Sequence, residues 1–350
     1  MIRELEILKD TDLRQLLGKE LQRAAKENPH QETNPVRTVA QWCAYVERFA
    51  HCMPWQGMDI GEDRSFFRRI DQNIGYFYFL LGDLQYEPRV AQWLKEYNTA
   101  WGEWLSSPES WNEDYYQLAR TDKRFELDTD RYESPANWHS WNDFFARKLR
   151  KPVHSFTHSL IHSFTSPCDG VIAEEGLIKT ATINNWLDLL GDSPYREIFA
   201  GGKTTHIILD VFDYHRFHMP CDGTVLESKT IQGIHAGGGV IIWDEAETRY
   251  RYEQCGVTDF QMLETRGVLV LDTQDYGKIA IVPVGVQQVS SVVWTFDHTP
   301  YTIHHTPYTL RQGDELGKFL FGGSDVVLFF EPGRAPRITA KSVKVGEKID

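Results

Sequence analysis

The hydrophobic pattern of this 350-residue chain changes near residue 140, and this change limits the fold to a mixed class. Before that point, apolar residues recur every three or four positions, which predicts amphipathic helices. Four such stripes cover residues 13–24, 39–49, 67–81 and 90–104. Thr11 is our predicted N-cap for the first stripe, and Gly82 ends the third.

After residue 140 the chain consists of short β-rich runs separated by Gly, Pro and Asp, at 205–212, 239–243, 268–272, 279–284, 289–294 and 326–331. Regularly spaced short strands are typical of a sandwich or a barrel-like unit. We therefore predict an α+β protein with a helical N-terminal region, residues 1–130, followed by a mainly β, sandwich- or barrel-like domain, residues 131–350. Residues 106–137 carry little periodicity and are interpreted as a linker.

Charge and composition exclude several classes of partner. The net charge of −13 argues against a nucleic-acid partner, which needs a basic face, and against strong attraction to an anionic membrane. The basic run at 147–151 is a local exception that could meet phosphate head groups. No apolar run approaches the ~20 residues of a membrane helix. The N-terminus lacks the layout of a secretory signal, and the five cysteines include no CxxC pair. We expect a cytoplasmic protein with at most peripheral membrane contact.

The triplet Gly322-Gly323-Ser324 precedes the apolar run 326–330 and is a candidate self-cleavage site. A serine hydroxyl at the start of a buried strand can attack the carbonyl group of the preceding residue, and glycine permits the strained backbone that such an attack needs. A Gly-Gly-Ser turn before a strand is also ordinary chain punctuation. The triplet alone therefore leaves both interpretations open.

Two further segments, at 166–172 and 213–223, supply candidate partners for the serine. A serine becomes a good nucleophile when a base removes its proton, and a histidine base works best when a carboxylate holds its tautomer. Ser324, one histidine of the pair His215 and His218, and Asp169 could fill these three roles. Asp-Gly is also a standard turn pair, and two histidines three residues apart often only pack.

Three histidines, His154, His158 and His162, are spaced by four residues and would share one face of a helix. The Ser, Thr and Phe residues around them favour extended structure instead. We expect no metal site there.

Taken together, the motifs resemble those of the phosphatidylserine decarboxylase family. That family has Ser-Pro-x-Asp-Gly, Asp-Tyr-His-Arg-x-His-x-Pro, and a Gly-Ser cleavage site after Glu-x-Gly-x-Phe, which correspond here to residues 166–170, 213–220 and 315–324. Other similar segments follow the family's order, at 140–149, 178–179 with 187–191, and 282–285 with 289–292. The resemblance covers roughly residues 138–335.

The resemblance implies that the chain cuts itself between Gly323 and Ser324 and that Ser324 becomes a pyruvoyl group, the cofactor of the decarboxylation. It implies His218 as the base for cleavage, Asp169 as the residue that orients it, and His215 as a proton donor in the decarboxylation. The substrate would be a primary amine with an adjacent carboxylate. The two chains are expected to stay associated, within a homo-oligomer.

Three departures from the family's pattern leave the substrate open. The chain has two glycines before the serine, Asp325 where threonine is common, and Glu264-Thr265-Arg266 where Asn-Glu-Arg is usual. The doubled glycine is similar to a soluble branch that decarboxylates free amino acids, including tryptophan. The substrate is therefore phosphatidylserine, giving phosphatidylethanolamine, or a free amino acid, aromatic ones included, giving its amine. The alternative hypothesis is a family member that no longer processes itself and serves as a binding or scaffolding protein.

Overall fold

The computed structural model describes residues 8–52, 70–157, 160, 162–177, 186–235, 237, 239–254, 262–285, 291–296, 308–321 and 324–350. These residues belong to two compact units. The first unit takes Met1–Ser110 together with Ile234–Phe260 and Gln287–Val289, and the second takes the rest. The boundary predicted at residue 130 stays a prediction.

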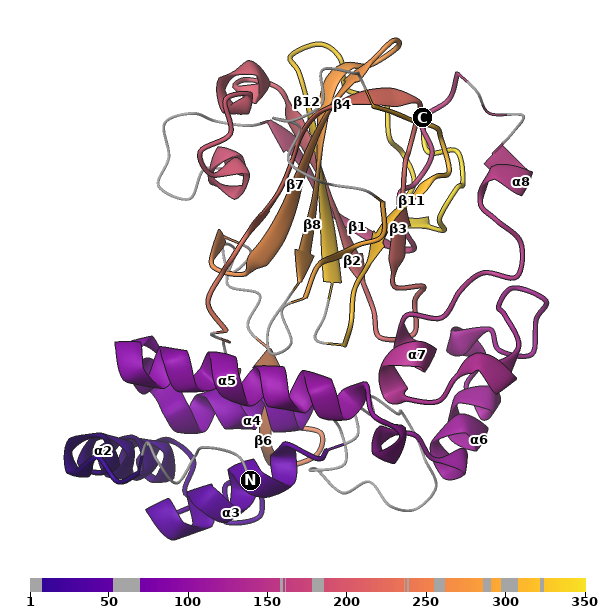
Figure 1. Ribbon diagram of the computed structural model, residues 1–350. Coiled ribbons are helices and arrows are strands. Elements are labelled where there is room, and N and C mark those ends of the chain that lie inside the picture. The colour runs from indigo at the N-terminus through magenta and orange to yellow at the C-terminus, as the bar shows by residue number, and fades with distance from the viewer. Residues whose placement is uncertain are drawn as a thin grey trace. The chain divides into compact units, whose positions relative to one another are not determined.

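Among its described residues, the first unit contains four α-helices and one β-hairpin, which can be followed in Figure 1. Its elements are α2 (Thr11–Glu27), α3 (Val39–Phe49), α4 (Ile70–Leu81), α5 (Pro88–Leu105), β5 (Gly239–Asp244) and β6 (Arg249–Gln254), with 3₁₀ turns at Gly82–Tyr86 and Pro108–Ser110. The four predicted helices are confirmed. The N-cap of α2 is Asp10 and not the predicted Thr11, because the Asp10 carboxylate accepts the N–H groups at the start of the helix.

Aromatic side chains form the core of the first unit, and the hairpin takes part in it. Tyr252 of β6 is buried and lies against the rings of Tyr76 and Phe79 from α4. Its hydroxyl group donates to the Thr33 carbonyl, and the amide of Asn28 donates to that hydroxyl. The predicted domain division assigns this hairpin to the β domain, because a strand pattern does not reveal which unit a hairpin joins.

The second unit contains short helices and most of the strands. Its helical elements are α6 (Glu113–Thr121), α7 (Trp141–Phe145) and α8 (His154–Thr157), with 3₁₀ turns at Lys123–Phe125, Pro135–Asn137, Trp186–Leu190 and Arg196–Phe199. Its strands are β1 (Gly170–Leu177), β2 (Lys203–Leu209), β3 (Arg216–His218), β4 (Gly223–Ile231), β7 (Thr265–Thr273), β8 (Gly277–Gly285), β9 (Val293–Trp294), β10 (Thr309–Leu310), β11 (Glu315–Lys318), β12 (Ser324–Phe330) and β13 (Ser342–Val343).

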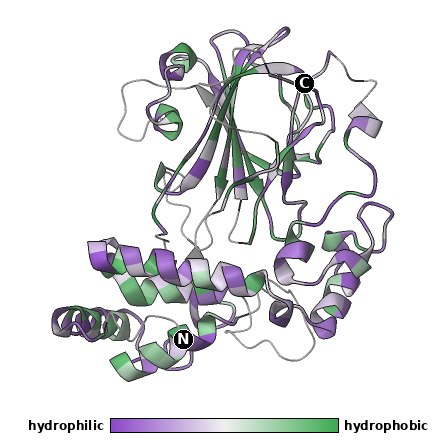
Figure 2. Cartoon of the chain, in the orientation of Figure 1, coloured by the Kyte–Doolittle hydropathy of each residue, from purple (hydrophilic) through white to green (hydrophobic). Residues whose placement is uncertain are grey.

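Eight strands form one antiparallel sheet in the order β10-β4-β7-β8-β12-β2-β1-β13. Among the described strands this order has two free ends, so the sheet is open and does not close into a barrel. A second sheet has the order β3-β11-β9. The central strands of the large sheet are strongly apolar, as the green ribbons of Figure 2 show, and all seven residues of β12 are buried. The predicted α+β class, with helices first and strands after, is confirmed.

The interpretation of residues 106–137 as a linker is wrong for a large part of that segment. It holds α6, which Asn112 caps by accepting the N–H of Tyr115, and Tyr115 and Phe125 are buried. Tyr115 lies edge-on against the ring of Trp141, with 4.4 Å between ring centroids. The helix has only nine residues, too few for the periodicity to stand out from its polar surroundings.

The backbone at the start of β1 requires a glycine at position 170. Its φ angle is +144°, and a Cβ atom there would lie 2.4 Å from the carbonyl oxygen of Ile208. Gly201 also has a positive φ of +76°, but nothing lies within 4 Å of an added Cβ. We expect Gly170→Ala to lower the free energy of unfolding by about 3 kcal/mol or more, and Gly201→Ala by about 1 kcal/mol. Urea denaturation measures both, and equal losses would contradict the steric account.

Candidate active site

Ser324 lies at the buried start of β12. The residue is 2% exposed, and its backbone is opposite Leu209 of β2 and Gly285 of β8. Pairing on both sides fixes the direction of the Ser324 side chain, because alternate residues of a strand point to opposite faces. The predicted cleavage partner Gly323, with Gly322, lies outside the described residues.

His215 is the residue that the structure brings to Ser324. It follows β2 after the turn closed by Asp210 and Asp213, and its Nδ1 lies 2.7 Å from the Ser324 Oγ. The imidazole is fully buried. It stacks on the Phe145 ring, with 3.7 Å between centroids and 17° between planes. The contact therefore sits in an apolar environment from which water is excluded.

The surroundings of His215 favour a neutral ring with a free electron pair toward the serine. Its Nε2 is buried and makes no hydrogen bond of normal geometry, but the carbonyl groups of Val211 and Asp210 favour a proton on the ring. With that proton on Nε2, Nδ1 accepts the Ser324 hydroxyl proton. Burial, and then the charge of Arg147, lower the pKa of His215 to about 3.

His218 lies in a different set of contacts. Its Nδ1 is 3.0 Å from the Gly313 carbonyl oxygen, and its Nε2 is 3.0 Å from the Tyr214 hydroxyl. A carbonyl oxygen only accepts, so Nδ1 carries the proton and the Tyr214 hydroxyl donates to Nε2. Burial lowers the pKa of His218. Both ring nitrogens are thus engaged away from Ser324.

Asp169 is fully buried and is held by cations and by backbone N–H groups. Nη2 of Arg131 donates to both of its oxygens, at 2.6 and 2.5 Å. The N–H groups of Val345 and Tyr214 donate at 2.9 and 3.4 Å, and Lys344 lies at 3.4 Å. Among the described residues, no imidazole contacts this carboxylate. Of the four predicted residues, only Ser324 and His215 contact each other in the described part of the chain. The roles predicted for His218 and Asp169 stay predictions.

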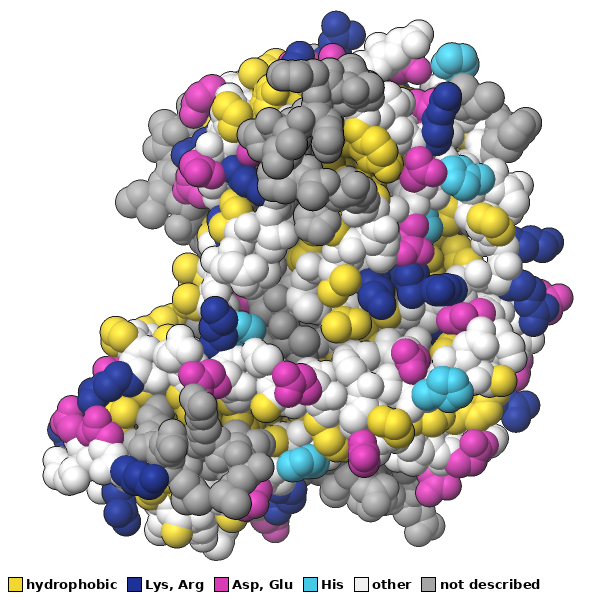
Figure 3. Space-filling view, viewed as in Figure 1, with side chains coloured by type: hydrophobic (Ala, Val, Ile, Leu, Met, Phe, Trp, Pro, Cys, Tyr) yellow, Lys and Arg dark blue, Asp and Glu magenta, His cyan; other side chains and the backbone are white. Residues whose placement is uncertain are grey.

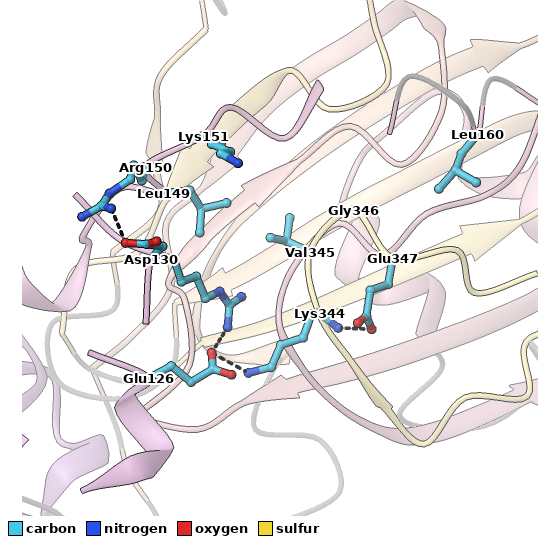
Figure 4. Close-up of a pocket in the computed structure, with 11 residues that line it drawn as sticks. Glu126, Asp130, Leu149, Arg150, Lys151, Leu160, Lys344, Val345, Gly346 and Glu347 are labelled. Carbon is cyan, nitrogen blue, oxygen red and sulfur yellow. Dashed lines mark hydrogen bonds and ion pairs between the residues drawn. The ribbon is translucent and has the colours of Figure 1, made fainter. Parts of the chain in front are cut away.

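A pocket of about 660 Å³ is lined in part by Arg131 and Lys344, the two cations that contact Asp169 (Figure 4). Among the lining residues, Glu126 forms ion pairs with Arg131 and Lys344, and Arg150 pairs with the exposed Asp130. Apolar walls come from Leu149, Leu160 and Val345. Its cations are largely paired with carboxylates, which leaves a mixed rather than a strongly basic lining.

Only part of the basic run 147–151 reaches this surface. Arg147 is fully buried, so the prediction that the run meets head groups is wrong for this residue. Its guanidinium donates to the carbonyl groups of Phe212 and Asp213 and lies 4.3 Å from the centre of the Tyr132 ring. On the face shown in Figure 3, acidic and basic side chains are interspersed.

Asp325, where the family commonly has threonine, faces away from the serine. Its carboxylate lies 2.8 Å from Nε2 of His206, and both side chains are buried. Trp186 lies edge-on against the same imidazole. Because consecutive residues of a strand point to opposite faces, this substitution leaves the contacts of Ser324 with His215 intact.

The predicted histidine stripe does not gather at one point. His154 contacts Asp314 at 3.0 Å, and His162 contacts Asp275 at 3.3 Å. His158 lies outside the described residues. No group of three or more metal-binding side chains occurs within the part of the chain that the structure describes.

Sequence reasoning missed the residues that support the site. Asn142 and Phe145 belong to the segment 140–149, which matches the family but gives these two residues no predicted role. Arg147 is predicted only as part of a basic surface run, whereas its side chain is buried. Arg131 carries no sequence signal, because an arginine becomes the partner of a distant aspartate only through the fold.

The low pKa of His215 predicts acid-sensitive stability. Below pH 6.5, the usual pKa of histidine, His215 is protonated in the unfolded chain but stays neutral in the folded one. The free energy of unfolding therefore falls as the pH drops toward 3. Between pH 7 and pH 5 this residue should cost about 2 kcal/mol. We expect the loss to disappear in His215→Asn, compared in a Ser324→Ala background by urea denaturation. An equal loss in both proteins would contradict a neutral, buried His215.

No helix among the described residues is long and apolar enough to span a bilayer.

Comparison with known proteins places the chain in a family. The family model for phosphatidylserine decarboxylase matches residues 141–350, more than half of the chain. A phosphatidylserine decarboxylase proenzyme of Chlamydia pneumoniae is 30% identical over 56% of this chain and 61% of its own length, which is less than two thirds. One from Alcanivorax borkumensis is 29% identical over 65% of this chain and 80% of its own length. The chain therefore belongs to the phosphatidylserine decarboxylase family of carboxy-lyases.

Proposed function

We propose that this protein is a self-processing, pyruvoyl-dependent decarboxylase that converts phosphatidylserine to phosphatidylethanolamine. The observation that carries the proposal is the 2.7 Å contact between the Ser324 Oγ and Nδ1 of a neutral, buried His215. A nucleophile within hydrogen-bond reach of a base is the arrangement that serine chemistry needs. The names of the two relatives reported above, both phosphatidylserine decarboxylase proenzymes, support both the cleavage and the lipid substrate.

In the proposed cleavage, His215 takes the proton of the Ser324 hydroxyl while Oγ of Ser324 bonds to the carbonyl carbon of Gly323. The bond from that carbon to the Ser324 nitrogen breaks, and the nitrogen receives the proton. Removal of the α-proton of residue 324 then expels the Gly323 carboxylate. The remaining dehydroalanine takes up water and releases ammonia, which leaves a pyruvoyl group on residues 324–350.

The pyruvoyl group fits the position that Ser324 occupies. A ketone oxygen replaces the amino nitrogen and a methyl group replaces the hydroxymethyl group, so the new group is no larger than the serine in its buried position. The group supplies an electron sink for the loss of carbon dioxide from a primary amine. His215, freed from the serine hydroxyl, can then hold a proton at Nδ1 for transfer to the product.

The two chains produced by cleavage should remain together. All seven residues of β12 pair with both β2 and β8. The new end of the small chain therefore lies inside an intact sheet. A homo-oligomer and a peripheral membrane contact stay predictions.

Substitution of the two histidines tests which one acts on the serine. His215→Asn removes the base, so we expect the cleavage rate to fall by about 10²-fold or more. His218→Asn keeps an N–H near the Gly313 carbonyl, and its cleavage rate should stay within about tenfold of wild type. Gel separation of the two chains over time measures both rates, and Ser324→Ala is the uncut control. A block in His218→Asn with normal cleavage in His215→Asn would favour the assignment made from family resemblance.

The substrate is tested with the processed protein. We expect carbon dioxide release from vesicles that contain phosphatidylserine, and none from phosphatidylcholine vesicles or from Ser324→Ala. Release only from a panel of free amino acids would contradict the lipid substrate. Release from neither, by a protein that never cuts itself, would favour a binding or scaffolding role.

A further inference from the structure

The backbone that leads to the proposed cleavage position is held at three successive residues. The N–H group of Phe319 donates to the carbonyl oxygen of His215 at 2.9 Å. That of Leu320 donates to the hydroxyl of Ser291 at 3.1 Å, and that of Phe321 donates to Oδ1 of Asn142 at 3.0 Å. Phe321 is the last described residue before Ser324.

The chain is also fixed on the far side of the cleavage position. Ser324 begins β12 and pairs with β2 and with β8. Three Cα–Cα steps separate Phe321 from Ser324, at about 3.8 Å per step. The anchor at Phe321 therefore lies only three residues before the nucleophile.

The acceptor of this anchor belongs to a well-fixed element. Asn142 is 4% exposed and lies in α7, which Ser140 caps by accepting the N–H of Asp143. Phe145, three residues further along the same helix, stacks on His215. One short helix thus contacts both the base and the backbone that precedes the nucleophile.

We propose that Asn142 is a positioning residue for self-cleavage, because its amide oxygen holds the Phe321 backbone so that the next carbonyl groups approach the Ser324 hydroxyl. This inference rests on the self-cleavage proposed above. Small errors in the placement of reacting groups are costly, since much of the rate depends on a near-attack geometry. Asn142 has no such role once the peptide bond is cut, so its effect should be confined to the precursor.

The test separates cleavage from decarboxylation. We expect Asn142→Leu, which removes the acceptor and keeps the shape, to slow cleavage of fresh precursor by about 10- to 100-fold. Asn142→Asp retains an acceptor and should recover part of this rate. For the fraction that has been cut, decarboxylation per pyruvoyl group should stay within about threefold of wild type. Asn137→Leu, at an exposed asparagine that binds Glu133, is the matched control and should cut at the wild-type rate.

Other outcomes overturn the inference in distinct ways. Wild-type cleavage rates in both Asn142 variants would remove the anchor role. An equal loss of cleavage and of decarboxylation per pyruvoyl group would mean that Asn142 only supports the fold. Asn142→Ala gives the same comparison if the leucine variant is insoluble. A wild-type chain that remains whole would instead contradict the proposed self-cleavage itself.

Discussion

The double pairing of β12 is the constraint on which the site depends. Every residue of this strand pairs with both β2 and β8. This pairing fixes the orientation of the first residue, Ser324. β2 then leads through a tight turn into His215. The nucleophile and its base are therefore set by two neighbouring strands of one sheet, and their 2.7 Å contact follows from the register.

The charged contacts of Asp169 are separate from the aromatic and backbone surroundings of His215. Charge is concentrated at Asp169, where Arg131 and Lys344 balance the carboxylate and tie together distant parts of the chain. His215 instead lies between an aromatic ring and backbone carbonyl groups, and its lowered pKa keeps it neutral. A neutral ring can accept the serine proton at any physiological pH. The same burial makes the protonated ring costly.

Hydrophobic periodicity was enough to predict the four long helices α2 to α5 and the strands β2, β5, β7, β8 and β12, because these elements bury long stripes or runs of apolar side chains. It could not assign the β5–β6 hairpin to the helical unit, since that depends on Tyr252 meeting residues that lie far away in the sequence. It also could not choose between His215 and His218. Residues three apart in an extended chain point to opposite faces, so only one of them reaches Ser324. The pairing of the strands places His215, and not His218, against Ser324.

The central claim is that Ser324 is converted and that the chain is cut before it. Intact mass spectrometry of purified wild-type protein tests this claim most directly. The account predicts two chains, residues 1–323 and 324–350, with the smaller one lacking a free amino end and reacting with a carbonyl reagent. A single unmodified chain of 350 residues would contradict it.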